Sequence, residues 1–116
     1  MEYSNNKPIY LQIVDEFIID IISSKIIQGE RLASIRDVAL EKKVNPNTVQ
    51  RAFSEMERMG IIYTQRGVGS FIVEDKELLD SLKNNVIEND MDTFLKKMNS
   101  YGCSNEEVIE LIKRRK

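Results

Sequence analysis

The segment from Asn45 to Gly60 places the strongest constraint on the fold of this chain. Asn45 is a favourable N-cap and Pro46 suits the first helical position, so a helix is expected to begin here. The apolar residues that follow are spaced so that they share one helix face: Val49, Ala52, Phe53 and Met56. The opposite face is polar, and Gly60 is suited to ending the helix. The pattern predicts a helix with one buried face and one polar face.

A shorter helix is predicted directly before it. Ser34 and Asp37 resemble a capping box, and three apolar residues would face inward before the run ends by Val44: Ile35, Val38 and Ala39. The helix that follows carries amide, hydroxyl and guanidinium groups near its start. Two helices joined by a short turn, with such groups on the second, indicate a helix-turn-helix.

The pattern changes after Gly60. Residues 61–64 and 70–73 are rich in β-formers, and the turn between them contains Arg66 and two glycines. These residues predict one β-hairpin with a basic tip. A hairpin in this position after a helix-turn-helix is the wing of a winged helix.

The two ends of the chain are predicted to be helical. Residues 8–28 carry an apolar stripe that predicts an amphipathic helix ended by Gly29. Apolar clusters at 78–86 and 91–98 predict two more helices, and Ser104 opens a last one with a capping box. The expected fold class is mainly α with a small β-hairpin. A winged helix-turn-helix spans residues 8–74, and a short α-helical dimerisation tail spans residues 75–116.

The amino-acid composition excludes several classes of functional site. The 116 residues include no His and one Cys, Cys103, which removes most zinc sites and catalytic triads and fits a reducing compartment. No apolar run exceeds three residues, which excludes a membrane span, and the N-terminus lacks the pattern of a signal peptide. We therefore expect a cytoplasmic protein that is not an enzyme, with no metal, no cofactor and no membrane partner.

Charge is distributed unevenly along the chain, whose net charge is −2. Residues 31–66 carry seven basic and four acidic groups, a net charge of +3, whereas the residues before and after them carry −3 and −2. A basic middle segment can present a phosphate-binding face even when the whole chain is acidic.

The stretch from Pro8 to Val73 resembles the DNA-binding domain of the GntR family of bacterial transcription regulators. The resemblance rests on PIYLQI at 8–13, GERLASIRDVA at 29–39, NTVQRAF at 47–53, and the glycines and GSF of the hairpin. The short tail is similar to the YtrA-like branch. That resemblance implies a homodimer held by the tail helices and repression, often of operons that encode ATP-driven transporters.

The helix pattern and the family resemblance together predict which residues contact DNA. In the major groove, Asn and Gln side chains can bond adenine and Arg can bond guanine. The wing has Val68 where many members carry a basic residue, so Arg66 is expected to be its main contact. The predicted DNA-binding residues are Ser34, Arg36, Asn45, Asn47, Thr48, Gln50, Arg51, Arg66 and Gly67.

Other basic residues of the middle segment have two interpretations. The first interpretation of Arg36 is a contact with DNA, and the second is an ion pair with Glu41 within its own helix. Four further cations bind phosphate or are simply solvated: Arg31, Lys42, Lys43 and Arg58.

A palindromic double-stranded operator matches a two-fold homodimer. The predicted dimerisation residues are Leu78, Leu82, Phe94, Leu95, Met98, Val108 and Leu111, although these side chains could instead fold onto their own chain. The competing function is a winged-helix module for protein–protein contact, which predicts an apolar outer face on the third helix. No residue cluster indicates a small-molecule effector site.

Overall fold

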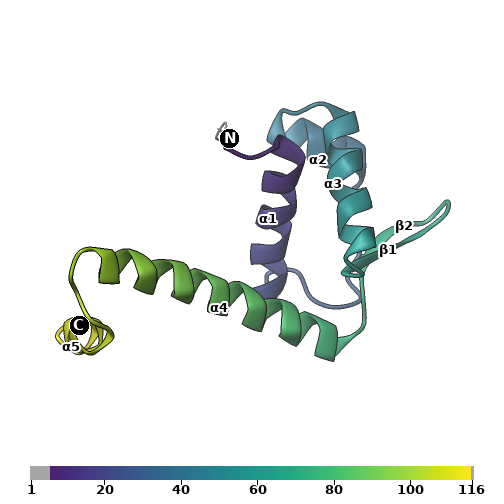
Figure 1. Ribbon diagram of the computed structural model, residues 1–116. Helices are drawn as coiled ribbons and strands as arrows, with labels where there is room; N and C mark the ends of the chain where they lie inside the picture. Colours follow the sequence, from purple (N-terminus) through teal and green to yellow (C-terminus); the bar gives the residue numbers. More distant parts are fainter. Residues whose placement is uncertain (1–5, 116) are drawn as a thin grey trace. The chain divides into compact units, whose positions relative to one another are not determined.

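The computed structural model describes residues 6–115 of the chain (Figure 1). Five helices and one hairpin follow in the order α1 (Ile9–Ile22), α2 (Ile35–Lys42), α3 (Pro46–Arg58), β1 (Ile62–Gln65), β2 (Gly69–Ile72), α4 (Lys76–Ser100) and α5 (Asn105–Lys113). Contacts divide the chain into two compact units after Asp80, inside α4. The boundary at residue 74 that the sequence suggests falls just before that helix.

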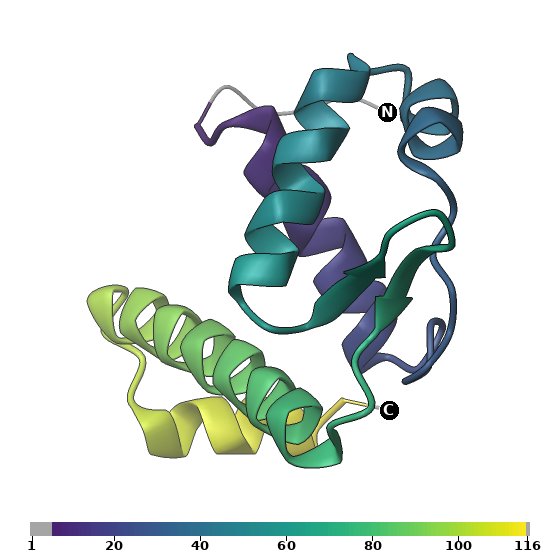
Figure 2. The ribbon, with the colours of Figure 1, turned by 90° about the vertical axis from the view of Figure 1, so that its right-hand side faces the viewer.

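The first unit is built around α3, which packs against α1, α2 and β1 (Figure 2). The apolar face predicted for this helix is buried, and Phe53 is only 2% exposed. Its ring meets that of Phe17 in α1 edge to face, with centroids 5.8 Å apart and planes at 88°. Burial of one face turns the polar side of α3 outward.

Both helices of the helix-turn-helix begin at the predicted residues, but α2 has only the Ser34 half of the expected capping box, because the Asp37 side chain does not bond the N–H of Ser34. The Ser34 hydroxyl accepts the N–H of Asp37 at 3.1 Å, and Asn45 Oδ1 accepts the N–H of Asn47 at 2.7 Å. Gly60 follows α3 with φ of +78°, a conformation that suits glycine. The cap residues and the glycine stop therefore position α3 as the sequence indicates.

The first helix ends earlier than expected. The predicted helix over residues 8–28 is wrong at its C-terminal end, because α1 stops at Ile22 and Ser24 takes φ of +65°. The N–H groups of Lys25 and Ile26 then both bond the carbonyl of Asp20, at 2.8 and 3.1 Å. Serines compete for local hydrogen bonds outside the helix, which explains why the chain leaves it here.

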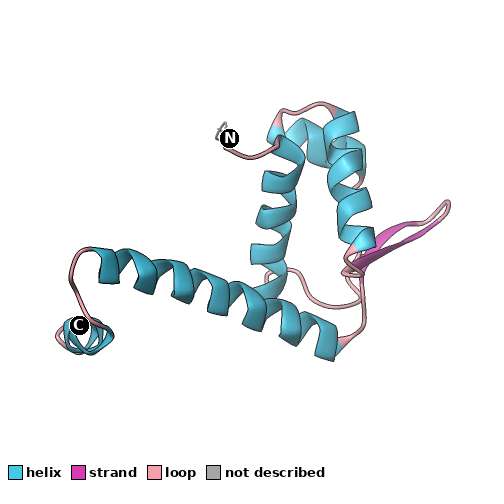
Figure 3. Ribbon diagram, in the orientation of Figure 1, coloured by secondary structure: helices cyan, strands magenta, loops and turns pink. Residues whose placement is uncertain are grey.

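The predicted hairpin is confirmed, with each strand shifted by one residue (Figure 3). The strands pair antiparallel, with Ile62 opposite Ile72 and Gln65 opposite Gly69. A short segment before α2 also pairs with β2: the N–H of Leu32 bonds the carbonyl of Ser70 at 2.8 Å, and the N–H of Ile72 bonds the carbonyl of Glu30 at 2.9 Å. This added pairing holds the base of the wing to the entry of α2.

The tail differs from the prediction in one respect. The two helices expected at 78–86 and 91–98 are a single helix, α4, which runs from Lys76 to Ser100. At about 100° per residue, the apolar stripe rotates by about 155°, nearly half a turn, between the two clusters. No Gly or Pro lies between them, so the helix continues while its apolar face changes.

The last helix begins with the predicted capping box. The Ser104 hydroxyl accepts the N–H of Glu107 at 3.1 Å, and Glu107 Oε1 accepts the N–H of Ser104 at 3.2 Å. Within the described residues, no helix has the length and apolarity required to cross a membrane.

Candidate nucleic-acid interface

The outward face of α3 carries the residues predicted to contact bases. Asn47, Gln50 and Arg51 are exposed, and Thr48 is half-buried. Their inward neighbours Val49 and Ala52 are fully buried, which fixes the rotation of the helix about its axis. A rigid helix therefore presents amide and guanidinium groups from its N-terminal half to the outside.

Two predicted contacts also act as helix caps. The oxygens of Asn45 and Ser34 each accept a backbone N–H at the start of α3 and α2. The amide N–H groups of Asn45 and the hydroxyl hydrogen of Ser34 stay free for donation. Each side chain can therefore cap its helix and still donate a hydrogen bond to a phosphate oxygen.

Arg36 lies on the exposed side of the first turn of α2. Among the described residues it forms no ion pair with Glu41, which was the alternative interpretation. Its guanidinium is therefore available beside the N-terminus of α2, where backbone N–H groups favour anions.

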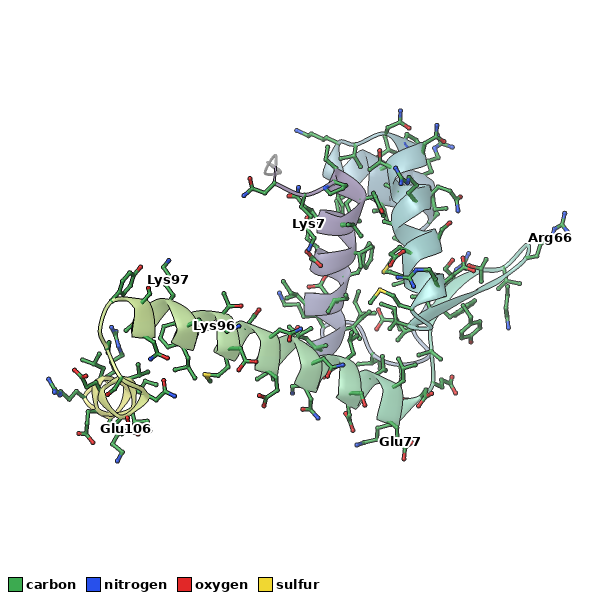
Figure 4. All side chains as sticks on the ribbon, in the orientation of Figure 1. Lys7, Arg66, Glu77, Lys96, Lys97 and Glu106 are labelled. Atoms are coloured by element: carbon green, nitrogen blue, oxygen red, sulfur yellow. The ribbon has the colours of Figure 1, made fainter. Side chains whose placement is uncertain are left out.

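The tip of the wing carries Arg66 and Gly67, both exposed (Figure 4). Figure 4 shows Arg66 extending from the end of the hairpin, away from the helices. Gly67 has φ of +79°, and apart from its own atoms and its chain neighbours no atom lies within 4 Å of where its Cβ would be. The turn closes through the N–H of Val68, which bonds the carbonyl of Gln65 at 2.9 Å. The tip of the wing therefore exposes one cationic side chain, that of Arg66.

The structure distinguishes three of the four cations whose role the sequence leaves open: Lys42, Arg58 and Lys43. Lys42 pairs with Glu16 at 2.9 Å, with its side chain only 12% exposed. Arg58 donates from Nε to Glu55 at 2.9 Å. Both cations therefore serve contacts inside the domain, whereas Lys43, in the left-handed conformation after α2, is exposed.

The ion pair between Glu55 and Arg58 on α3 also shifts the pKa values of both side chains. The side-chain hydrogen bond from Arg58 is the main influence on Glu55 and lowers its pKa; burial opposes this shift, and the charge of Arg58 adds a smaller lowering. The same hydrogen bond raises the pKa of Arg58. The pair is fully charged at neutral pH.

Four contacts of this face had no signal in the sequence pattern. Arg31 lies beside the wing, with its Nε 2.7 Å from where a Cβ of Gly69 would be. The hydroxyl of Thr64 in β1 donates to Glu57 of α3 at 3.0 Å and lies 2.9 Å from that of Ser70. The guanidinium carbon of Arg51 lies 4.2 Å from the centre of the Tyr10 ring. Each contact joins residues that only the packing of separate elements brings together.

The predicted dimerisation residues differ in exposure. Val108 is 3% exposed within the single chain, and a Leu78 methyl lies 3.5 Å from where a Cβ of Gly60 would be. Phe94 and Leu111 are 45% and 41% exposed. The remaining three are half-buried: Leu82, Leu95 and Met98.

The family model described as "Bacterial regulatory proteins, gntR family" matches residues 9–72, more than half of the chain. The chain belongs to the GntR family. It is a DNA-binding transcription regulator, as the resemblance implied. The matched residues run from the start of α1 to the end of β2 and so include the helix-turn-helix and the wing.

Relatives of this GntR protein extend the likeness into the tail. The HTH-type transcriptional regulator YhcF of Bacillus subtilis (strain 168) is 43% identical over 112 residues, which cover 97% of this chain and 93% of the relative. The HTH-type transcriptional repressor YtrA of the same organism is 34% identical over 94% of this chain and 85% of its own length. A solved structure of a GntR family transcriptional regulator from Listeria monocytogenes superposes with a TM-score of 0.91 at 35% identity, covering 98% of this chain and all of that one.

Proposed function

We propose that this GntR regulator is a repressor that binds a palindromic operator as a homodimer. The observation that carries the proposal is the outward face of α3, where Asn47, Gln50 and Arg51 are exposed on a helix anchored by a buried apolar face. An apolar outer face, which the protein-contact alternative requires, is absent from the described α3.

The groups on α3 have the chemistry of major-groove readout. Asn and Gln amides bond the N6 and N7 edge of adenine, and Arg bonds O6 and N7 of guanine. Arg36 at the start of α2 and Arg66 at the tip of the wing flank this helix with positive charge. In the proposed complex α3 enters the major groove, Arg36 contacts the backbone and Arg66 reaches the neighbouring groove.

The tail supports the dimer. Ile87, Met91 and Phe94 are 46%, 48% and 45% exposed, and with Met98 they follow spacings of four, three and four residues on α4. That spacing forms the narrow apolar seam of a helix that packs lengthwise against another helix. A second copy would cover this seam and supply the two-fold symmetry that a palindromic operator requires.

Repression is supported by the name of one relative, the transcriptional repressor YtrA, whose likeness extends over the tail. Control of a transporter operon is supported only by the resemblance to the YtrA-like branch. The test measures expression from a reporter promoter that overlaps the bound site, with and without the protein. We expect the protein to lower expression, and a rise in expression would contradict repression.

The DNA part of the proposal is tested by selection from double-stranded oligonucleotides with a random core. The best selected duplex and a scrambled version are then titrated by fluorescence anisotropy at low and high salt. We expect two half-sites about 10 base pairs apart, bound more tightly than the scrambled duplex by a factor of about 10³ or more. Equal binding of both duplexes would contradict a sequence-specific operator, and no binding at low salt would favour the protein-contact alternative.

The dimer is tested by sedimentation of the free protein at micromolar concentration. We expect a dimer for the wild type, a monomer for Phe94→Glu, and a dimer for the control Lys97→Glu, which changes an exposed position on the same helix (Figure 4). A monomeric wild type would refute the proposed dimer.

A further inference from the structure

Tyr10 is the residue through which α1 reaches the polar face of α3. It lies in the first turn of α1 and is half-buried. The guanidinium carbon of Arg51 sits 4.2 Å from the centre of its ring, well within the range of a cation–π contact. The two residues are 41 positions apart, so the contact exists only because α1 and α3 pack against each other.

The contact restrains Arg51 without removing it from solvent. Arg51 remains exposed although the ring lies against it. An arginine side chain has many rotamers, and part of this freedom is lost when it bonds a partner. A ring that holds the guanidinium in the free protein reduces the loss on binding, and the N–H groups at the edge of the cation stay available.

The neighbouring residues hold Tyr10 in place. Lys7 pairs with Asp15 at 2.5 Å, and Gln12 donates to the carbonyl of Lys7 at 2.7 Å, which ties the chain before α1 to the helix. Three residues on from Tyr10, Ile13 is fully buried. The ring is therefore attached to a rigid part of the domain.

We infer that Tyr10 is a specificity-positioning residue: its ring holds the guanidinium of Arg51 in the orientation that reads one base pair, without touching DNA itself. This inference rests on the proposed function, in which Arg51 contacts a base. A role in positioning differs from a role in packing, because it changes discrimination at one base pair and leaves nonspecific, salt-dependent binding intact.

The test uses the full-length protein and selection from random duplexes, with the preference at each base pair read by sequencing. Tyr10→Leu removes the ring and keeps an apolar side chain, Tyr10→Phe keeps the ring, and Ile9→Ala is a matched change at an exposed neighbour. Arg51→Ala identifies the base pair that Arg51 reads. Thermal unfolding of every variant reports on packing separately.

We expect Tyr10→Leu to reduce discrimination at the Arg51 base pair by about two- to fivefold, the range that cation–π contacts at exposed sites support. Tyr10→Phe and Ile9→Ala should retain it, and affinity for scrambled DNA should be unchanged in all three. In the Arg51→Ala background, Tyr10→Leu should have no further effect on that base pair.

Three outcomes would overturn the role of Tyr10 alone. These are a wild-type preference that persists in Tyr10→Leu, a loss spread equally over all base pairs, and an effect of the same size in the Arg51→Ala background. A wild-type protein that selects no sequence would instead refute the proposed function, and the role of Tyr10 with it.

Discussion

Replacement of Arg66 by Ala tests the wing contact quantitatively. Arg66 extends alone from the tip of the hairpin and has no ion pair with any residue of the described chain. Its charge is therefore free to enter the neighbouring groove, where it neutralises about one phosphate charge. Each phosphate neutralised on B-DNA contributes about 0.9 to the slope of log affinity against log salt, so two wings of a dimer contribute about 1.8.

That slope fixes the size of the effect. Between about 50 and 200 mM salt, a fourfold range, the affinity ratio of wild type to Arg66→Ala should shrink by about 12-fold for a dimer. A single wing contact would give about 3.5-fold. The assay is an anisotropy titration of the selected duplex at several salt concentrations.

Arg58→Ala is the matched control, since it removes the same charge from the same domain. Arg58 is bonded to Glu55 and is therefore not counted among the phosphate contacts. Its salt slope should equal that of the wild type. A slope for Arg66→Ala equal to the wild-type slope, or an equal loss in Arg58→Ala, would refute the assignment of free and engaged cations.

Three further predictions concern stability and pH. Phe53→Ala removes a buried ring that meets Phe17 edge to face, and should lower the free energy of unfolding by about 3–5 kcal/mol in urea denaturation. Ser104→Ala removes the hydroxyl of the capping box, which should destabilise α5 by about 1 kcal/mol and accelerate its amide hydrogen exchange about fivefold. The pKa of Glu55 is lowered in the folded state, so its contribution to stability is complete above the ordinary pKa of 4.5 and fades as the pH falls through the lowered pKa. Glu55→Gln should therefore show a smaller loss of stability over that acid range, measured by thermal unfolding; an identical loss would contradict the shift.

The two errors in the sequence-based prediction have local causes. A stripe of isoleucines continues past Ile22, but α1 ends there and is followed by Ser23 and Ser24. The predicted helix is too long because an apolar pattern indicates which residues are buried and does not indicate their backbone conformation. In the tail, two apolar clusters predict two helices where α4 is one. A helix can change its buried face along its length without a break, and spacing alone does not distinguish the two cases.

The sequence by itself determined the elements that carry function. Asn45 and Pro46 start the recognition helix, the spacing of Val49 to Met56 selects its buried face, and Arg66 between two β-rich runs marks the wing. These signals lie within a few residues of one another, so they act through backbone geometry and helix periodicity, which a sequence displays directly.

Only the tertiary structure decided which charged groups are available. Lys42 and Lys43 are adjacent, yet Lys42 is bonded to Glu16, 26 residues away, and Lys43 is exposed. Arg51 meets Tyr10 in the same way, across the packing of α1 and α3. Periodicity tells which face of a helix is buried but not which residue of another helix lies opposite, because that depends on the rotation and offset of the packed helices.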